Sequence, residues 1–405
     1  MEYSEEQARE LLVEAGQKLF ELGLVARTWG NISARISDTQ FVITPSGRPY
    51  DTITPEQIVV ANISDWKYTG ELRPSDEIGI HAEAFRIRPD VNFVIHTHQH
   101  NACIIAATET PITYVPEEYR PILGDYIPCG DYGLPATKKL VRGVTAAAQK
   151  YPQSRAVIMK HHGTACFGKD FDDTFNIALA LEEVCKITIE NKYLERSKAT
   201  SFDENAMRDF YLSLVNSRLK MPQDIIDLGC SKRHGDKFTL KMADCGSFDV
   251  PLDSSPIGDS VPSVAKIHKE IYNTSSVQFI SHLSDPNAVA LSVVAAPMKS
   301  YLDDYAQIAG TVVNSCAWDE SDASAKVIAR TIRGKNAVLV KNLGAICTAN
   351  NAGDLTAINI VMAKGCEAQI AVKLFGNGEP IGYLDRLIMR KVYTLYYSKQ
   401  ADKKV

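Results

Sequence analysis

Two short apolar runs in this chain each end in histidine. Residues 94–98 read VIHTH, and residues 157–163 read VIMKHHG. Alternate residues of a β-strand project from the same face, so His96 and His98 can direct two imidazoles toward one point. A third imidazole from a neighbouring strand end would complete a three-histidine site with an open position. This is the arrangement that a catalytic zinc ion requires.

The alternative for these histidines is a set of hydrogen-bonded imidazoles in a core. An isolated HxH pair would favour that alternative, but the second run ending in His-His-Gly favours a metal, since zinc prefers nitrogen-rich sites. His161 and His162 would point to opposite faces of a continuing strand, so only one of them can be a ligand. His81 and His100 are weaker candidates, because one lies in a predicted helix and the other follows the end of the strand.

Two further side chains have the chemistry of proton transfer. Glu77 lies just inside a predicted helix that leads toward the His96 strand, where a carboxylate can act as a general base beside a metal-bound substrate. The alternative is that Asp76 and Glu77 only stabilise the positive end of that helix. Tyr132 lies in a loop, residues 128–133, and is either an acid or a packing ring. Spacing alone does not decide between these roles.

Two glycine-bearing turns lie beside small polar side chains. They are Gly30-Asn31 and residues 44–47, which read TPSG. Such turns can present backbone N–H groups to a phosphate. Ordinary turn formation explains them equally well.

The composition is that of an ordinary globular protein. The chain has 405 residues, of which 45% are hydrophobic and 23% charged, enough for two domains. A formal charge of -5 and a pI near 6.0 give no electrostatic reason to expect nucleic acid as a partner. No uninterrupted apolar run of about 18 residues occurs, so we expect no membrane span.

The termini and cysteines predict a cytoplasmic location. Residues 1–6 read MEYSEE, which is too acidic and polar for a signal peptide. The nine cysteines are dispersed and include no CxxC pair. Such a set on a chain without a secretion signal indicates reduced thiols in the cytoplasm.

Hydrophobic periodicity predicts helices that alternate with strands. Residues 4–22 are expected to form an amphipathic helix, with Ser4 as N-cap, Gln7 three residues later and Gly23 just past its end. Further helices are expected over residues 77–86, 101–107 and 172–192, and strands over residues 31–35, 40–44, 58–63, 93–96 and 156–160. Because the order has no regular βαβ rhythm, we expect an α/β sheet of mixed or antiparallel pairing covered by helices.

The pattern recurs after a polar connector, residues 193–235. Residues 93–102 align with residues 279–288, and residues 156–166 align with residues 337–347, in the same order. We interpret this as an internal duplication, with domains at residues 1–200 and 201–405.

The second copy lacks the chemistry of the first. Ser284 stands at the position of His98, and Leu343 at that of His162. Leucine cannot bind a metal, so we expect no metal site in residues 201–405. His282 alone keeps its place, and we expect it to be structural.

Six motifs follow one another in the first half of the chain. They are residues 23–33 (GLVARTWGNIS), 43–47 (ITPSG), 74–77 (PSDE), 96–98 (HTH), 128–132 (PCGDY) and 161–163 (HHG). Together they resemble the class II aldolase/adducin family, which includes L-fuculose-1-phosphate aldolase. The resemblance covers about residues 4–195, and the second half shares it only through the duplication.

The resemblance implies a fold and a set of site residues. The fold is an αβα sandwich around a mainly antiparallel sheet, in two tandem copies. One zinc ion per chain would be held in the first domain by His96, His98 and His162, with Glu77 as acid/base. Tyr132 would reach a neighbouring subunit's site and protonate the leaving aldehyde. The phosphate pocket would be built from Thr28, Asn31, Ser46, Gly47, Ser75 and position 76, where Asp76 replaces a second serine of the family pattern.

The resemblance also implies an activity and an assembly. The activity is metal-dependent aldol cleavage of a ketose 1-phosphate to dihydroxyacetone phosphate and an aldehyde. Asp76 favours an alternative, another metal-dependent lyase or isomerase such as an epimerase or decarboxylase, because a carboxylate repels a phosphate dianion unless it is neutralised or points away. A third possibility is a non-catalytic, adducin-like scaffold. Two tandem chains are expected to form a homo-oligomer, a pseudo-fourfold ring.

Overall fold

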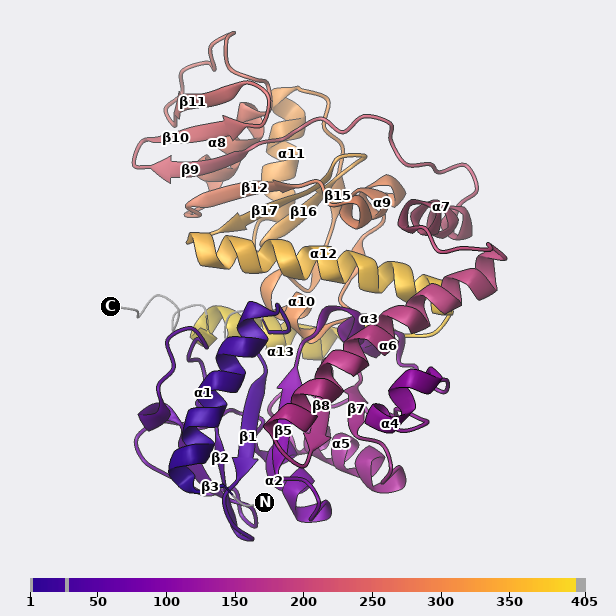
Figure 1. The fold of residues 1–405 in the computed structure, drawn as a ribbon. Coiled ribbons are helices and arrows are strands. Elements are labelled where there is room, and N and C mark those ends of the chain that lie inside the picture. Colours follow the sequence, from indigo (N-terminus) through magenta and orange to yellow (C-terminus); the bar gives the residue numbers. More distant parts are fainter. Residues whose placement is uncertain (1–2, 26–28, 398–405) are drawn as a thin grey trace. The chain divides into compact units, whose positions relative to one another are not determined.

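The computed structural model describes residues 3–25 and 29–397. The chain divides into two compact units, of which the first contains residues 3–195 and the second contains residues 196–374 and 379–397. The element order is shown in Figure 1, where the colours follow the sequence from indigo to yellow. Each unit has its own central sheet and its own core.

The first unit is built on an eight-stranded sheet in the order β4-β3-β2-β1-β5-β8-β7-β6 (Figure 1). Neighbouring strands are antiparallel except β6 and β7, which are parallel. The strands are β1 (Asn31–Arg35), β2 (Gln40–Ile43), β3 (Val59–Asn62), β4 (Tyr68–Thr69), β5 (Phe93–Thr97), β6 (Cys129–Gly130), β7 (Ala156–Met159) and β8 (Gly163–Gly168).

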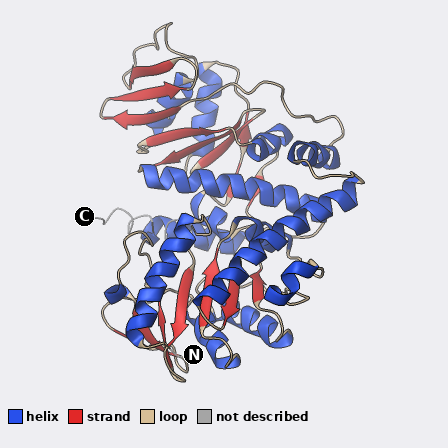
Figure 2. Cartoon of the chain, in the orientation of Figure 1, coloured by secondary structure: helices blue, strands red, loops and turns tan. Residues whose placement is uncertain are grey.

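Helices cover both faces of this sheet (Figure 2). They are α1 (Glu5–Glu21), α2 (Ile78–Ile87), α3 (His100–Thr108), α4 (Arg120–Leu123), α5 (Lys138–Lys150) and α6 (Phe171–Ser197). Phe85 of α2 and Val144 of α5 share a buried core with Val94 of β5, so these two helices lie on one face. On the other face Phe171 of α6 packs its ring edge-on against Phe93, with the ring centroids 5.7 Å apart.

The sequence signals that begin and end α1 act as expected. The Ser4 side chain accepts from the backbone N–H of Gln7, and the Gln7 side chain accepts from the backbone N–H of Ser4, which is a capping box. Gly23, with φ +68°, follows the last helical turn in the left-handed region. The buried residues of the helix lie on one stripe, and they are Ala8, Leu12, Ala15, Gly16 and Leu19.

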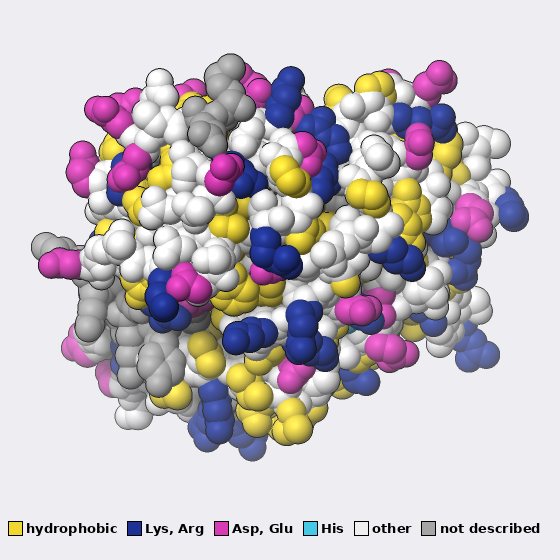
Figure 3. Space-filling model, turned by 90° about the horizontal axis from the view of Figure 1, so that it is seen from below, with side chains coloured by type: hydrophobic (Ala, Val, Ile, Leu, Met, Phe, Trp, Pro, Cys, Tyr) yellow, Lys and Arg dark blue, Asp and Glu magenta, His cyan; other side chains and the backbone are white. Residues whose placement is uncertain are grey.

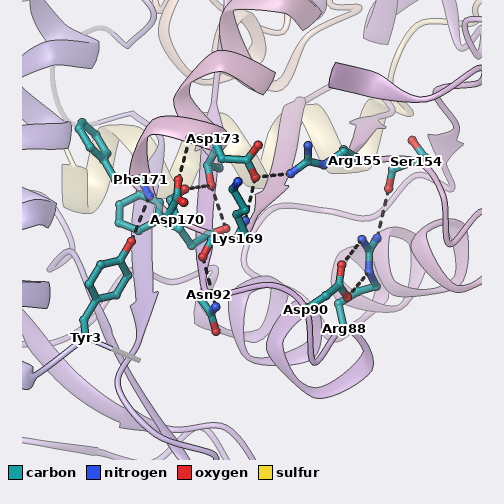
Figure 4. A network of polar contacts seen from close by, with 12 residues as sticks. Tyr3, Arg88, Asp90, Asn92, Ser154, Arg155, Lys169, Asp170, Phe171 and Asp173 are labelled. Carbon is teal, nitrogen blue, oxygen red and sulfur yellow. Dashed lines mark hydrogen bonds and ion pairs between the residues drawn. The ribbon is translucent and has the colours of Figure 1, made fainter. Parts of the chain in front are cut away.

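A polar network holds β5 and β8 together at the ends opposite the histidines (Figure 4). The Asn92 side chain donates to the carbonyl oxygen of Lys169 at 3.2 Å. The Asp173 carboxylate accepts from the guanidinium of Arg155 and from the backbone N–H of Lys169. The network opposes a slip of one residue between the strands, which would turn His96 to the other face.

The second unit is built on a seven-stranded sheet in the order β11-β10-β9-β12-β17-β16-β15, with a separate two-stranded ladder of β13 and β14. Its strands are β9 (Cys230–His234), β10 (Lys237–Met242), β11 (Gly246–Pro251), β12 (Phe279–Leu283), β13 (Met298–Lys299), β14 (Val312–Val313), β15 (Ser315–Cys316), β16 (Ala337–Val340) and β17 (Gly344–Ala349). Its helices are α7 (Glu204–Val215), α8 (Ala265–Thr274), α9 (Pro286–Val294), α10 (Asp303–Ile308), α11 (Asp322–Ile332), α12 (Ala352–Phe375) and α13 (Tyr383–Val392).

The second sheet repeats the strand order and the register of the first. Its strands β9, β10, β11, β12, β17, β16 and β15 have the same neighbours as β1, β2, β3, β5, β8, β7 and β6. Phe93 pairs with Gly168 in one sheet, and Phe279 pairs with Ala349 in the other. The predicted fold class, an α/β fold with a mainly antiparallel sheet in two tandem copies, is therefore confirmed.

Among the described helices, α12 has the length and composition of a possible membrane span. Its most apolar window has a mean hydropathy of 1.2, and 61% of that window is buried. A mostly buried helix of this kind is also typical of a protein core. One such helix is weak evidence for a membrane.

The second unit contains a buried histidine that makes its stability depend on pH. His268 of α8 donates from Nε2 to the carbonyl oxygen of Leu228 at 2.8 Å, and its Nδ1 lies 2.7 Å from the Ser231 hydroxyl. Burial lowers the pKa of His268 from 6.5 to about 4. Below about pH 6.5 the unfolded chain therefore binds a proton that the folded chain excludes, so stability present at pH 7 is lost as the pH falls.

We expect the free energy of unfolding to be ~2 kcal/mol smaller at pH 5 than at pH 7 because of this group. Urea denaturation of the full chain at both pH values measures it. The His268→Gln variant is less stable at pH 7 but has a weaker pH dependence. An unchanged pH dependence in that variant would contradict the assignment.

Candidate metal centre

The histidines of the first run lie at the end of β5, on the face that α2 covers. His96 is fully buried and donates from Nδ1 to the backbone carbonyl oxygen of Thr164 at 2.7 Å. This contact places a proton on Nδ1 of His96, so Nε2 is the nitrogen that can bind a ligand once it carries no proton of its own. The backbone of β8 therefore orients the first imidazole.

The structure brings three of the predicted imidazoles together. The ring centroids of His96 and His98 are 5.0 Å apart, those of His96 and His162 are 5.0 Å apart, and those of His98 and His162 are 4.7 Å apart. One ligand atom from each residue lies within 4.8 Å of those of the other two. His162 reaches this cluster from the turn between β7 and β8.

Glu77 places its carboxylate between two of these rings. Its Oε2 lies 3.0 Å from Nε2 of His96, and its Oε1 lies 2.7 Å from Nε2 of His162. Glu77 is the N-cap residue of α2, so the start of that helix determines its position. Burial raises the pKa of Glu77, but the charges of His162 and His96 and their hydrogen bonds outweigh burial and hold this pKa well below its usual value. The carboxylate is therefore ionised at neutral pH.

A chain of side chains that the sequence did not reveal holds Glu77 in place. The Asn31 amide donates from Nδ2 to Glu77 Oε2 at 3.1 Å, and its Oδ1 accepts from Nε2 of His81. His81 Nδ1 in turn contacts the Ser33 hydroxyl at 2.6 Å. Burial lowers the pKa of His81 to about 3, so its ring is neutral. In the second copy His268 and Ser231 form the same pair, and a comparison of the two copies would have identified it.

Two glycines allow the strands to approach closely beside the site. A Cβ on Gly163 would lie 2.3 Å from the carbonyl oxygen of Thr97 and 3.3 Å from Cε1 of His96. Gly30 has φ +80°, and a Cβ there would lie 2.6 Å from the carbonyl oxygen of His96. Both distances are too short for a side chain, so glycine is required at each position.

The predicted phosphate residues are only partly brought together. Thr28 lies outside the described residues. The backbone bridge between Pro45 and Pro74 brings the Ser46-Gly47 turn beside the segment that contains Ser75. The Ser75 hydroxyl accepts from the backbone N–H of Glu77 at 3.3 Å. Asn31 is turned toward Glu77 and His81, as described above.

Asp76 forms an ion pair with Arg73. The Arg73 guanidinium contacts Asp76 Oδ1, and the Arg73 side chain is exposed while that of Asp76 is largely covered. The Arg73 charge offsets part of the charge of the carboxylate that replaces serine in the family pattern. This reduces its repulsion of a phosphate, which was the objection raised by the sequence.

Tyr132 lies beside the residue that precedes His162. Its ring packs edge-on against the His161 ring, with the centroids 5.5 Å apart. His161 Nε2 lies 3.1 Å from Oε1 of Glu109, whereas His162 Nε2 contacts Glu77. Consecutive histidines therefore point at two different carboxylates, and only His162 joins the three-imidazole cluster.

The equivalent place in the second unit has lost this chemistry. His282 of β12 donates from Nε2 to the Leu343 carbonyl oxygen at 2.6 Å, and its Nδ1 accepts from the backbone N–H of Leu228 at 3.1 Å. Ser284 and Leu343 replace the other two imidazoles, and Val264, the N-cap residue of α8, stands where α2 has Glu77. His282 is thus engaged in structural contacts.

The donors of the first unit suit a divalent metal ion. Three imidazole nitrogens converge, one of them oriented by a backbone carbonyl, next to an ionised carboxylate that balances positive charge. Imidazole donors of this number and arrangement are those that zinc and related transition metals prefer. His96, His98 and His162 can therefore hold a metal ion.

Solved structures similar to this chain include several sugar-phosphate aldolases. An L-fuculose 1-phosphate aldolase is 26% identical, with a TM-score of 0.43, and the match covers 49% of this chain and 92% of that one. The L-fuculose-1-phosphate aldolase of Thermus thermophilus is 21% identical, with a TM-score of 0.39, and the match covers 48% of this chain and 97% of that one. YgbL of Klebsiella pneumoniae is described as a proposed aldolase, epimerase or decarboxylase. It is 20% identical, with a TM-score of 0.41, and the match covers 46% of this chain and 89% of that one.

The match to a protein family covers more of the chain than any of these structures. The Class II Aldolase and Adducin N-terminal domain matches residues 10–189 and, separately, residues 236–370. The two segments contain the equivalent sheets of the two units. The chain therefore belongs to the class II aldolase and adducin family, with two tandem copies of the family domain.

Proposed function

We propose that this protein cleaves a ketose 1-phosphate by a metal-dependent retro-aldol reaction, releasing dihydroxyacetone phosphate and an aldehyde. The observation that supports this most is the position of Glu77 between the imidazoles of His96 and His162. A carboxylate in contact with a metal-binding cluster can move a proton at a carbon next to the metal.

The reaction requires two proton movements. When the C3–C4 bond of the ketose breaks, the C4 hydroxyl loses a proton to become the aldehyde, and C3 must gain one. Glu77 is ionised in the resting protein, so it must first take up a proton, equivalent to the one that the C4 hydroxyl releases, and then pass it to C3, while Asn31 holds the carboxylate in position. The Tyr132 hydroxyl exchanges a proton with the oxygen on C4. A divalent ion, zinc in our proposal, held by His96, His98 and His162 supplies Lewis-acid polarisation of the substrate carbonyl.

The substrate phosphate would lie over the Ser46-Gly47 turn and Ser75, with Thr28 completing the pocket. Backbone N–H groups of turns bind anions well, and Arg73 adds a positive charge at the rim. Asp76 adds a negative charge at the same place.

The Asp76→Ser variant is therefore expected to lower KM for the ketose 1-phosphate by about threefold, because a carboxylate partly exposed to water is only weakly coupled to the phosphate. We expect kcat to be unchanged. Steady-state kinetics of the variant and the wild type measure the difference. A rise in KM would contradict this place for the phosphate.

The test of the activity is direct. Metal-loaded protein is incubated with a panel of ketose 1-phosphates, and dihydroxyacetone phosphate is measured by a coupled enzyme assay. Release from at least one member, lost after removal of the metal with a chelator, supports the proposal. Absence of cleavage across the panel overturns it.

Asp76 also favours a second candidate, another metal-dependent lyase or isomerase on the same scaffold. A carboxylate in the place of the second serine suits a substrate without a phosphate at that position. An epimerised or decarboxylated product without aldol cleavage would identify this case.

We propose that the second domain, residues 201–405, binds no metal, and that the chain forms a homo-oligomer of tandem copies in a pseudo-fourfold ring. The mass of the protein in solution tests the assembly, and a monomer contradicts it.

Charges of both signs are interspersed on the face shown in Figure 3, so no single-sign field there favours a polyanion. All nine cysteines lie among the described residues and are free thiols, which is in keeping with the proposed cytoplasmic location.

A further inference from the structure

A second histidine–carboxylate pair lies outside the metal cluster, next to Tyr132. Glu109 accepts through Oε1 from His161 and through Oε2 from the ammonium group of Lys160. The His161 ring is buried and meets the Tyr132 ring edge-on at 69°, with the centroids 5.5 Å apart. The Lys139 ammonium lies over the same tyrosine ring, 5.6 Å from its centroid. The tyrosine ring thus contacts both His161 and Lys139.

The backbone around Tyr132 is fixed separately, by close approach to α5. A Cβ on Gly133 would lie 2.2 Å from the backbone nitrogen of Leu140, and a Cβ on Gly143 would lie 2.4 Å from the carbonyl oxygen of Asp131. The loop backbone therefore lies directly on the helix backbone. The direction of the Tyr132 side chain then depends on the groups that contact its ring.

The second copy shows that the pair is not needed for the fold. At the position of Glu109, which caps α3 with φ 58°, the second copy has Ala295, which caps α9 with φ 55°. At the position of His161, with φ 64°, it has Asn342, with φ 66°. The same helix end and the same turn thus form without a carboxylate or an imidazole.

Tyr132 is also replaced in the copy that has lost two of the three metal ligands. The parallel pairing of Cys129 with Ile158 matches that of Ser315 with Leu339, which places Trp318 at the position of Tyr132. Trp318 packs against the hydrophobic core of the second unit. Lysine remains at the position of Lys160, as Lys341. The copy that lacks two of the metal ligands has therefore also lost Glu109, His161 and Tyr132.

We propose that Glu109 and His161 are positioning residues for Tyr132: the carboxylate fixes the His161 ring, and that ring fixes the direction of the tyrosine hydroxyl. This rests on the function proposed above for Tyr132, and it assigns a role to the histidine beside the ligand His162. An edge-to-face ring pair is weak by itself. It becomes directional here because the imidazole is buried and its Nε2 is held by the Glu109 carboxylate.

Fluorine NMR tests the positioning without any assay of activity. 3-Fluorotyrosine is introduced at position 132 of the full chain, and its resonance is recorded in wild type, His161→Asn and Glu109→Ala. Both variants carry the residues of the second copy, which occupy the same backbone conformation, so both are expected to fold. The resonance should shift in both variants and should stay in place in Glu83→Gln, a change on α2 that affects only the Glu83–Arg86 ion pair. An unmoved resonance in His161→Asn overturns the proposal.

Kinetics test whether His161 acts through Tyr132. We expect Tyr132→Phe to lower kcat by about 100-fold and His161→Asn by about tenfold, with KM within about twofold of wild type. The double variant should be no slower than Tyr132→Phe, because the positioning of a hydroxyl has no effect once the hydroxyl is gone. Losses that multiply in the double variant overturn the proposal.

The metal content separates this role from an effect on the ligand. His161→Asn should retain the metal ion that we propose for the wild type, about one per chain. A loss of metal in that variant would show that His161 acts on His162 instead, and would overturn the proposal. If the wild type cleaves no ketose 1-phosphate, the proposed function fails, while the fluorine resonance still decides whether His161 positions Tyr132.

Discussion

The His162→Leu variant is expected to bind no metal and to lose all turnover while it remains folded. Leucine is the residue that the second copy has in the same turn, as Leu343, and its side chain is buried in the core there. Two imidazoles on one strand end do not complete a site for zinc, which takes three protein ligands in its catalytic sites. The metal content should fall from about one ion per chain to near zero.

The matched control is His282→Ala in the second copy. His282 is equivalent to His96 but is held by the Leu343 carbonyl and the backbone N–H of Leu228, so its removal should leave the metal content and the activity as in wild type. Metal analysis of the purified variants and their circular dichroism spectra provide the measurement. A His162→Leu protein that keeps its metal would contradict the assignment of His162 as a ligand.

The second large effect is expected at Glu77. Glu77→Gln keeps the shape of the side chain and its contact with Asn31 but cannot take up a proton, so we expect kcat to fall by about 10²- to 10⁴-fold. The metal should remain bound, because the three imidazoles are unchanged. A protein that keeps its metal but loses turnover would show that Glu77 transfers protons and is not a metal ligand.

Glu83→Gln on the same helix is the control for this substitution. Glu83 pairs with Arg86 and has no contact in common with Glu77 among the described interactions. It should leave kcat unchanged. Equal losses in the two variants would indicate damage to α2 rather than the loss of a proton carrier.

Long elements with a regular pattern could be predicted from the sequence. The helix expected over residues 4–22 is α1, Glu5–Glu21, and the helix expected over residues 77–86 is α2, Ile78–Ile87. The strand expected over residues 93–96 is β5, Phe93–Thr97. In each case the apolar spacing or the capping residue gave the signal.

Strand β8 gave no such signal. Its residues, GTACFG, are small or mixed, and every one of them is buried. A strand covered on both faces has no alternation of polar and apolar residues, and its glycines point to a turn instead. The start of the second sheet was missed for another reason: β9 carries charged residues on an exposed face and lies within the expected connector, residues 193–235.

The sequence predicted which residues of the site have reactive groups, but not the side chains that hold them. HxH spacing and the His-His-Gly run are local patterns, so they can be read from one chain. The contacts of Asn31 with His81, and of Glu109 with His161, join residues about 50 positions apart in the chain. Such contacts depend on strand order, which no local pattern gives.

The identical register of the two central strand pairs has a consequence for biogenesis. Strand β5 pairs with β8 as β12 pairs with β17, so a chain released from denaturant has two near-equivalent partners for each strand. Synthesis on the ribosome avoids this choice, since residues 1–195 emerge and can close their sheet before residues 279–283 exist. Renaturation of the full-length polypeptide from urea therefore competes with mispairing between the repeats, and such traps are common in repetitive chains.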